Sequence, residues 1–251
     1  MKKGYGVFGK AYETMFRNDL HDQGSVDHYL LKNMIFLDEK SYDFLYKTPK
    51  LVPEAVKSHD LYAFSKQFEG KDDLETVRNL LDYIYQTVQK FETPFEAMMF
   101  GGTEKEILDR GTDWCTDISR VGCTLLQCLK IPSRMVYIAD IDKAYHGHAV
   151  VEAYIDGVYT MCDFLYGVLG MIEKQYSVYD LLKRPVLTKN IYGNRADIEY
   201  IQNVYKAAAV SFYDITKAFQ YTVTKPNAYY LRLMQLNQTG KWLMGEDDAS
   251  Q

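Results

Sequence analysis

The stretch from His148 to Asp163, HAVVEAYIDGVYTMCD, holds two apolar runs separated by Asp156-Gly157. Asp-Gly between two such runs is among the strongest short-range signals for a β-hairpin with a two-residue loop. The sequence therefore predicts strands over residues 148–155 and 158–163, paired antiparallel.

The loop length also sets the register of this hairpin. If Ile155 faces Val158, then Val150 faces Asp163, and His148 lies one step further along on the same face as the aspartate. Diagonal neighbours of this kind are roughly 7–8 Å apart at Cα, so a carboxylate can reach an imidazole. The other face of the first strand carries only apolar side chains, which leaves the His148 face as the polar one.

Two helices and a strand are expected before the hairpin. Asp72 is a suitable N-cap, with Glu75 three residues later as in a capping box, and an apolar stripe continues to about Phe91. A second helix should run from about residue 113 to 129, and residues 134–139 (RMVYIA) read as a strand. Helices followed by antiparallel strands define an α+β fold.

The remaining parts of the chain are expected to be mainly helical. We divide the chain into an N-terminal region (1–70), a core (71–170) and a C-terminal region (171–251), all in one compact unit. Within the last region, residues 197–219 form a good helix candidate because an alanine run raises helix propensity.

Composition excludes several functional classes. The 251 residues are 47% hydrophobic and 25% charged, as in ordinary globular proteins, and the net charge of -5 argues against non-specific nucleic-acid binding. No apolar run has the length of a secretory signal or of a membrane span. The four cysteines lack the dense spacing of a disulfide scaffold, so we expect a cytoplasmic protein with reduced thiols.

One of these cysteines, Cys115, stands at a predicted helix start within the sequence DWCTDIS. Unpaired backbone N–H groups and the positive end of the helix dipole favour a thiolate there. Taken alone, the helix start explains Cys115 less well than the role of a buried structural thiol does. The hairpin, however, supplies His148 as a base and Asp163 as the group that orients it, which is what a cysteine nucleophile requires.

A metal site is the main alternative for these histidines. His146-x-His148 could chelate a metal together with Cys115 or Cys162, but the cysteines form no C-x-x-C knuckle. We therefore expect no metal and place His146 in a solvated loop. Cys123, Cys128 and Cys162 are expected to be core residues.

Residues 107–167 as a whole resemble the transglutaminase-like superfamily of papain-like folds. The resemblance lies in a helix that opens on cysteine, in residues 129–136 (LKIPSRMV), in residues 148–154 (HAVVEAY), and in the Asp-Gly hairpin that ends at Asp163. Three positions depart from the family pattern: Lys130 replaces a glycine, Val150 a tryptophan, and Phe164 a proline.

The resemblance implies a Cys115–His148–Asp163 triad that works through a thioester acyl-enzyme, on a helix packed against an antiparallel sheet. The backbone N–H of Cys115 would serve an oxyanion hole, with the Trp114 indole as a candidate second donor and His146 as a further substrate-side candidate. Arg134 would be a structural salt-bridge partner. No cofactor is implied.

The expected activity is hydrolysis of an amide or peptide bond in a peptide, protein or other amide-containing substrate, rather than cross-linking. A transglutaminase or an acyltransferase to an amine acceptor would use the same three residues. A non-catalytic interaction module that keeps the fold would usually have lost one of them. Neither nucleic acid nor membrane is expected as a partner.

Overall fold

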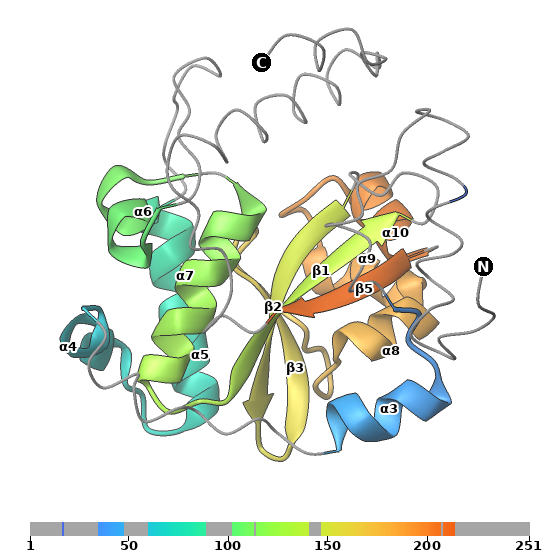
Figure 1. Cartoon of the computed structure of the whole chain (residues 1–251), viewed down its shortest axis with the longest axis horizontal. Coiled ribbons are helices and arrows are strands. Elements are labelled where there is room, and N and C mark those ends of the chain that lie inside the picture. The colour runs from blue at the N-terminus through green and yellow to red at the C-terminus, as the bar shows by residue number, and fades with distance from the viewer. Residues whose placement is uncertain are drawn as a thin grey trace, which may run out of the picture.

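The computed structural model describes residues 17, 35–47, 60–88, 102–112, 114–140, 147–206 and 208–213. These residues form one antiparallel five-stranded sheet in the order β4-β3-β2-β1-β5, with helices on its two faces (Figure 1). The α+β class expected from the sequence is confirmed. The strands are β1 (Ser133–Asp140), β2 (Gly147–Ile155), β3 (Val158–Asp163), β4 (Val168–Leu169) and β5 (Ala208–Tyr213).

The hairpin β2–β3 has the predicted register. Pairing runs from Ile155 opposite Val158 to Val151 opposite Cys162. Asp156 and Gly157 have φ angles of 51° and 87°, the positive values that a type I′ loop needs at its two central residues. The strands predicted over 148–155 and 158–163 are therefore confirmed to within one residue.

The helices form two groups, one on each face of the sheet (Figure 1). On one face, α7 packs on β2 and β1, and α4, α5 and α6 pack against α7. On the other face, α10 packs on β1 and contacts α8 and α9. The helices are α3 (Glu39–Tyr46), α4 (Tyr62–Ser65), α5 (Asp73–Tyr83), α6 (Glu104–Arg110), α7 (Cys115–Cys128), α8 (Val178–Lys183), α9 (Thr188–Tyr192) and α10 (Ile198–Lys206). Short 3₁₀ turns cover Lys66–Phe68 and Pro185–Leu187, and a π-helical turn covers Ile84–Val88.

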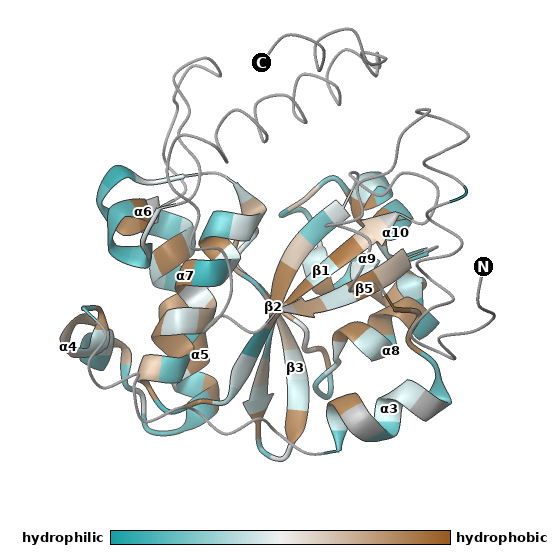
Figure 2. Ribbon diagram, in the orientation of Figure 1, coloured by the Kyte–Doolittle hydropathy of each residue, from teal (hydrophilic) through white to brown (hydrophobic). Residues whose placement is uncertain are grey.

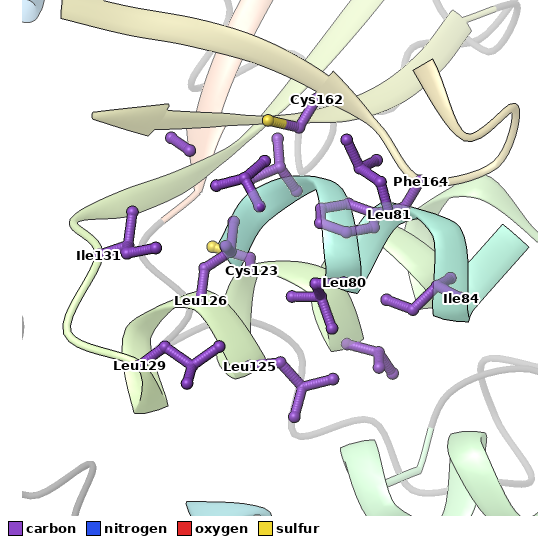
Figure 3. Packing of buried hydrophobic residues seen from close by; sticks show 14 of the residues in the cluster. Leu80, Leu81, Ile84, Cys123, Leu125, Leu126, Leu129, Ile131, Cys162 and Phe164 are labelled. Carbon is purple, nitrogen blue, oxygen red and sulfur yellow. The ribbon is translucent and has the colours of Figure 1, made fainter. Parts of the chain in front are cut away.

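Each face of the sheet has its own hydrophobic core. In the first core, side chains of α5 and α7 pack against Cys162, which lies in β3, and against Phe164, which directly follows β3 (Figure 3). The second core joins Val136, Ile138 and Val150 to α8, α9 and α10. Hydrophobic residues are frequent in the strands and in α5 and α7, whereas α6 is largely hydrophilic (Figure 2).

The face of β2 that carries His148 also carries Glu152, as predicted, but both polar side chains are buried and share this face with Val150 of the second core. Glu152 is 0% exposed, and its Oε2 atom lies 2.7 Å from Nη2 of Arg134. Its Oε1 accepts a hydrogen bond of 2.8 Å from the backbone N–H of Val178 at the start of α8. A buried carboxylate needs such partners, and the structural salt-bridge role expected of Arg134 is confirmed.

The same guanidinium lies among aromatic rings, 4.6 Å from the ring centroid of Tyr46, 3.8 Å from Tyr159 and 4.3 Å from Phe212. It also donates a hydrogen bond to the backbone carbonyl of Leu45. Arg134 therefore connects α3 and β5 to the centre of the sheet.

The chain leaves the end of α7 through a residue in the left-handed conformation, two positions after Cys128. Lys130 has a φ angle of 66°, its N–H donates to the carbonyl of Gln127, and the N–H of Ile131 donates to the carbonyl of Leu126. This pair of bonds is a Schellman motif, in which glycine is the usual left-handed residue.

The two helices predicted before the strands have the expected starts. Asp72 caps α5 by accepting a 2.8 Å hydrogen bond from the N–H of Glu75. The Glu75 side chain accepts from the N–H of Lys71 rather than from the cap itself, so the expected capping box is not reciprocal. Residues 89–91, where this helix was expected to end, lie outside the described residues.

The helix predicted over 197–219 is wrong in its second half. Helix α10 ends at Lys206, and Ala208–Tyr213 form β5, which pairs with β1 from Met135 opposite Tyr213 to Asp140 opposite Ala208. The alanine run favoured a helix, but Val210 and Phe212 alternate onto the second core as a strand requires. Tertiary pairing along an otherwise open sheet edge outweighs local propensity here.

Within the described residues, no helix combines the length and the apolar character needed to cross a membrane.

Candidate active site

The side chains of His148 and Asp163 form a buried hydrogen-bonded pair. His148 is the second residue of β2 and Asp163 is the last residue of β3. The Nε2 atom of His148 lies 2.7 Å from Oδ2 of Asp163, and the two residues are 1% and 0% exposed. This is the diagonal contact that the hairpin register predicts.

The carboxylate of Asp163 accepts hydrogen bonds from four donors. Besides His148, its Oδ2 atom accepts from the Tyr192 hydroxyl at 2.8 Å. Its Oδ1 atom accepts from the backbone N–H groups of Leu165 at 3.0 Å and Tyr166 at 3.3 Å. An ionised carboxylate is an acceptor only, and this arrangement uses it as such. The pattern assigns a proton to Nε2 of His148, which leaves Nδ1 facing other partners.

Cys115 is a second hydrogen-bonding partner of the imidazole. It is the first residue of α7, it is partly exposed, and its side chain forms a hydrogen bond with that of His148. Because Nε2 is taken by Asp163, Nδ1 is the ring nitrogen available to the sulfur. The sulfur also lies at a helix start, where unpaired N–H groups favour negative charge.

The environment of His148 keeps its imidazole protonated. Burial acts to lower the pKa, but the charge and hydrogen bond of Asp163, together with the hydrogen bond to Cys115, outweigh it and raise the pKa to about 10. At neutral pH the ring is therefore an imidazolium that donates from both nitrogens. An imidazolium between a carboxylate and a sulfur atom is suited to a thiolate nucleophile.

Two contacts hold α7 in register with the hairpin. The hydroxyl of Ser119 donates a buried 2.9 Å hydrogen bond to the carbonyl of Ala149, the residue after the histidine. The ring of Phe164, the residue after the aspartate, lies so close to Gly122 that a Cβ there would be 2.4 Å from two ring carbons. These contacts fix the cysteine helix against the residues that follow its two partners.

Helix α6 braces the start of α7 through two largely buried ion pairs. Nη2 of Arg110 lies 3.1 Å from Oδ2 of Asp117, and Nε of Arg120 lies 2.8 Å from Oε1 of Glu104. Arg120 also donates to the backbone carbonyl of Gly102. Since Asp117 is in the first turn of α7, these pairs restrain the helix end that carries the cysteine.

Two tyrosine rings flank the imidazole. The ring centroid of His148 lies 5.6 Å from that of Tyr166 and 6.5 Å from that of Tyr200, whose hydroxyl donates to the carbonyl of Gly147 at 3.1 Å. Burial and the nearby charge of Asp163 raise the pKa of Tyr166 to about 12, so its hydroxyl is neutral. These rings give the site aromatic walls.

Trp114 and His146, the other candidate site residues, have different outcomes. Trp114 is the N-cap residue of α7 and is partly buried, and its backbone N–H donates to the Thr112 hydroxyl at 3.0 Å. This bond engages the backbone N–H of Trp114, whereas the predicted oxyanion donor is its indole N–H. His146 lies outside the described residues.

The other three cysteines are core residues, as predicted. Cys123, Cys128 and Cys162 are each 0% exposed. Burial and the charge of Glu104 raise the pKa of Cys128 to about 11, and burial also raises the pKa of Cys162. Among the described residues, histidine, cysteine and acidic side chains form no group of three or more that could hold a metal.

The sequence did not point to the three tyrosines of this site. Tyr192 is 29 residues from the aspartate that it contacts, and no local pattern connects the two. Tyr166 follows the end of β3 closely, but Tyr200 reaches the site only because α10 packs back on the sheet.

Comparison of the chain with protein-family models, with curated proteins and with solved structures finds no match. The chemistry of the site is therefore inferred from its own residues.

Proposed function

We propose that the protein is a cysteine-dependent acyl-transfer enzyme that hydrolyses an amide or peptide bond through a thioester intermediate. The observation that carries this proposal is that the His148 imidazole is hydrogen-bonded to Asp163 through Nε2 and also to the side chain of Cys115. This arrangement supplies a nucleophile, a proton carrier and an orienting group in contact.

In the acylation step, Sγ of Cys115 attacks the carbonyl carbon of the substrate and forms a C–S bond. The imidazolium of His148 gives its proton to the leaving nitrogen as the C–N bond breaks, so a neutral amine departs and a thioester remains. In the second step, the neutral imidazole takes a proton from water while the water oxygen attacks the thioester. The C–S bond then breaks, which releases a carboxylic acid and restores the thiolate.

Asp163 orients the imidazole and stabilises its charged form, and its four hydrogen-bond donors hold the carboxylate in place for this role. For the oxyanion of the tetrahedral intermediate, we assign the backbone N–H of Cys115 as one donor. The indole N–H of Trp114 is the proposed second donor, since Trp114 directly precedes the nucleophile.

We also propose that the core has a transglutaminase-like fold. The order of elements supports this, because α7 opens on the cysteine and is followed by the antiparallel strands β1, β2 and β3. The conformation of Lys130 supports it further, since the resembling family segment has glycine there and the φ angle of 66° is one that glycine adopts readily.

A thiol nucleophile has to stay reduced, and Cys115 forms no disulfide in the structure. We therefore expect the enzyme to act in a reducing compartment such as the cytoplasm.

Trapping of the acyl-enzyme tests this function. The protein is incubated with a panel of peptide esters and anilides, quenched in acid, and analysed by intact mass and peptide mapping. We expect an acyl adduct on the peptide that contains Cys115, and we expect neutral hydroxylamine to remove it. The adduct should be absent from Cys115→Ala and present in Cys128→Ala, which removes a buried thiol instead.

Adding a primary amine to the same reactions separates hydrolysis from transfer. Release of the free acid in the presence of excess amine supports a hydrolase, whereas an amide product assigns the enzyme to transamidation. An adduct that persists in Cys115→Ala, or no adduct with any acyl donor, would contradict the proposed nucleophile.

A further inference from the structure

Tyr192 contacts the proposed triad from outside the segment that resembles a known family. It is the last residue of α9, it is 1% exposed, and its hydroxyl donates a 2.8 Å hydrogen bond to Oδ2 of Asp163. The same oxygen receives Nε2 of His148 at 2.7 Å. One buried carboxylate oxygen therefore serves two donors.

Two donors on one oxygen compete for the same negative charge. In a buried site each bond is strong, and withdrawal of one donor leaves more charge for the other. The Tyr192 hydroxyl therefore weakens the hold of Asp163 on the imidazolium, whereas the backbone bonds to Oδ1 fix the direction of the carboxylate.

Several titratable groups face this pair and belong to the same electrostatic unit. Burial and the charge of Asp163 raise the pKa of each of four tyrosines, and, against the effect of burial, Asp163 and Cys115 raise the pKa of His148. The groups that face the pair are Cys115 from α7, Tyr166 after β3, Tyr192 from α9, and Tyr200 and Tyr205 from α10. Of the five, only Tyr192 gives Asp163 a side-chain hydrogen bond.

We propose that Tyr192 is a positioning residue that acts through Asp163 and sets how firmly His148 holds its proton. The kinetic part of this inference rests on the proposed function, because His148 has to give that proton to the leaving amine. An imidazolium held more firmly is a weaker acid, so losing the hydroxyl should slow acylation.

The decisive experiment is proton NMR of the full-length chain, which needs no substrate. In Tyr192→Phe, the resonance of the His148 Nε2 proton should move downfield, and the imidazole should titrate at higher pH than in the unaltered protein. Tyr176→Phe is the matched control. It removes the hydroxyl of another buried tyrosine of the same core, whose ring lies beside Lys174 and Arg184, so both readouts should stay nearly unchanged.

Replacement of Tyr192 by fluorinated tyrosines keeps the ring and the hydroxyl, so the test stands even if the phenylalanine variant folds poorly. A more acidic phenol is a stronger donor, and the resonance should then move upfield as the acidity rises. A resonance that stays in place in Tyr192→Phe, or that moves upfield as it would if the carboxylate lost its orientation, would overturn the inference.

Kinetics then separate the two proposals. With an active enzyme, Tyr192→Phe should lower kcat roughly threefold to tenfold at an unchanged KM, and Tyr176→Phe should not. The expected NMR shift in a chain that forms no acyl-enzyme would refute the function and leave the role of Tyr192 standing. An unshifted resonance in an active enzyme would refute the role of Tyr192 alone.

Discussion

The ring of Phe164 lies directly on the backbone of Gly122, so closely that a Cβ on this glycine would meet ring carbons at 2.4 Å. Phe164 follows the aspartate of the candidate site, and Gly122 is on the helix that begins with its cysteine. The contact therefore joins the two elements that carry the ends of the hydrogen-bonded chain. Its geometry explains a glycine in the middle of a buried helix, where alanine would otherwise be preferred.

Gly122→Ala should therefore destabilise the protein, although the same change in an exposed helix would stabilise it. We expect the free energy of unfolding to fall by about 1–3 kcal/mol, as measured by chemical denaturation, because the added methyl group overpacks the core. The double variant Gly122→Ala/Phe164→Leu should recover part of the loss. A stabilised single variant would show that the ring moves aside freely.

Lys130→Gly should stabilise the protein through the end of α7. The left-handed conformation costs a non-glycine residue roughly 1–2 kcal/mol, and the greater freedom of glycine in the unfolded chain offsets about 0.4–1 kcal/mol of that gain. The expected net increase in the free energy of unfolding is roughly 0.5–1 kcal/mol. Lys130→Ala, which keeps the Cβ atom, is the control and should show no increase.

The part of the site that could be predicted from the sequence is the part set by local rules. The Asp156-Gly157 loop fixes a register, and the register alone brings His148 to Asp163. The start of α7 at Cys115 likewise follows from helix patterning.

What could not be predicted depends on contacts between distant segments. Local propensity predicts a helix over the residues of β5, because its alanines carry no sign of the open edge of β1 that they cover. Tyr192 reaches Asp163 only after α9 packs on the sheet, and the burial of Glu152 depends on Arg134 and on the start of α8.

The pKa of His148 predicts how stability varies with pH. Because the folded protein raises this pKa from an ordinary value near 6.5 to about 10, the folded state holds a proton that the unfolded state loses between these pH values. The stabilisation is fully present below about pH 6.5 and is lost as the pH rises toward 10, by up to about 1.4 kcal/mol per pH unit.

Chemical denaturation at a series of pH values measures this effect. The difference in unfolding free energy between the unaltered protein and His148→Gln should shrink as the pH rises through that window. Asp163→Asn should also flatten the dependence, since it removes the charge that holds the proton. A difference that stays constant from pH 6 to pH 10 would show that the folded imidazole is not protonated.

The buried ion pair of Arg134 and Glu152 predicts a strong asymmetry between single and double variants. Glu152→Gln leaves the guanidinium without a full counter-charge in the core, and we expect a loss of about 3–5 kcal/mol in unfolding free energy. Replacing the two residues together by methionine should cost less than the single change. Equal and additive losses in a double-mutant cycle would contradict the coupling that the 2.7 Å contact indicates.

The most direct test of the central claim is the rate at which each thiol of the native protein reacts with iodoacetamide near neutral pH, followed by peptide mapping. Cys115 is partly exposed and hydrogen-bonded to His148, whereas Cys123, Cys128 and Cys162 are buried. Denaturant should make the four thiols react at similar rates, which controls for the reagent.

In the native protein we predict that Cys115 is alkylated at least about tenfold faster than the other three thiols. We further predict that His148→Ala slows the reaction of Cys115 by a similar factor without changing the others. Equal labelling of all four thiols, or a Cys115 rate that does not depend on His148, would contradict the assignment of Cys115 as the nucleophile.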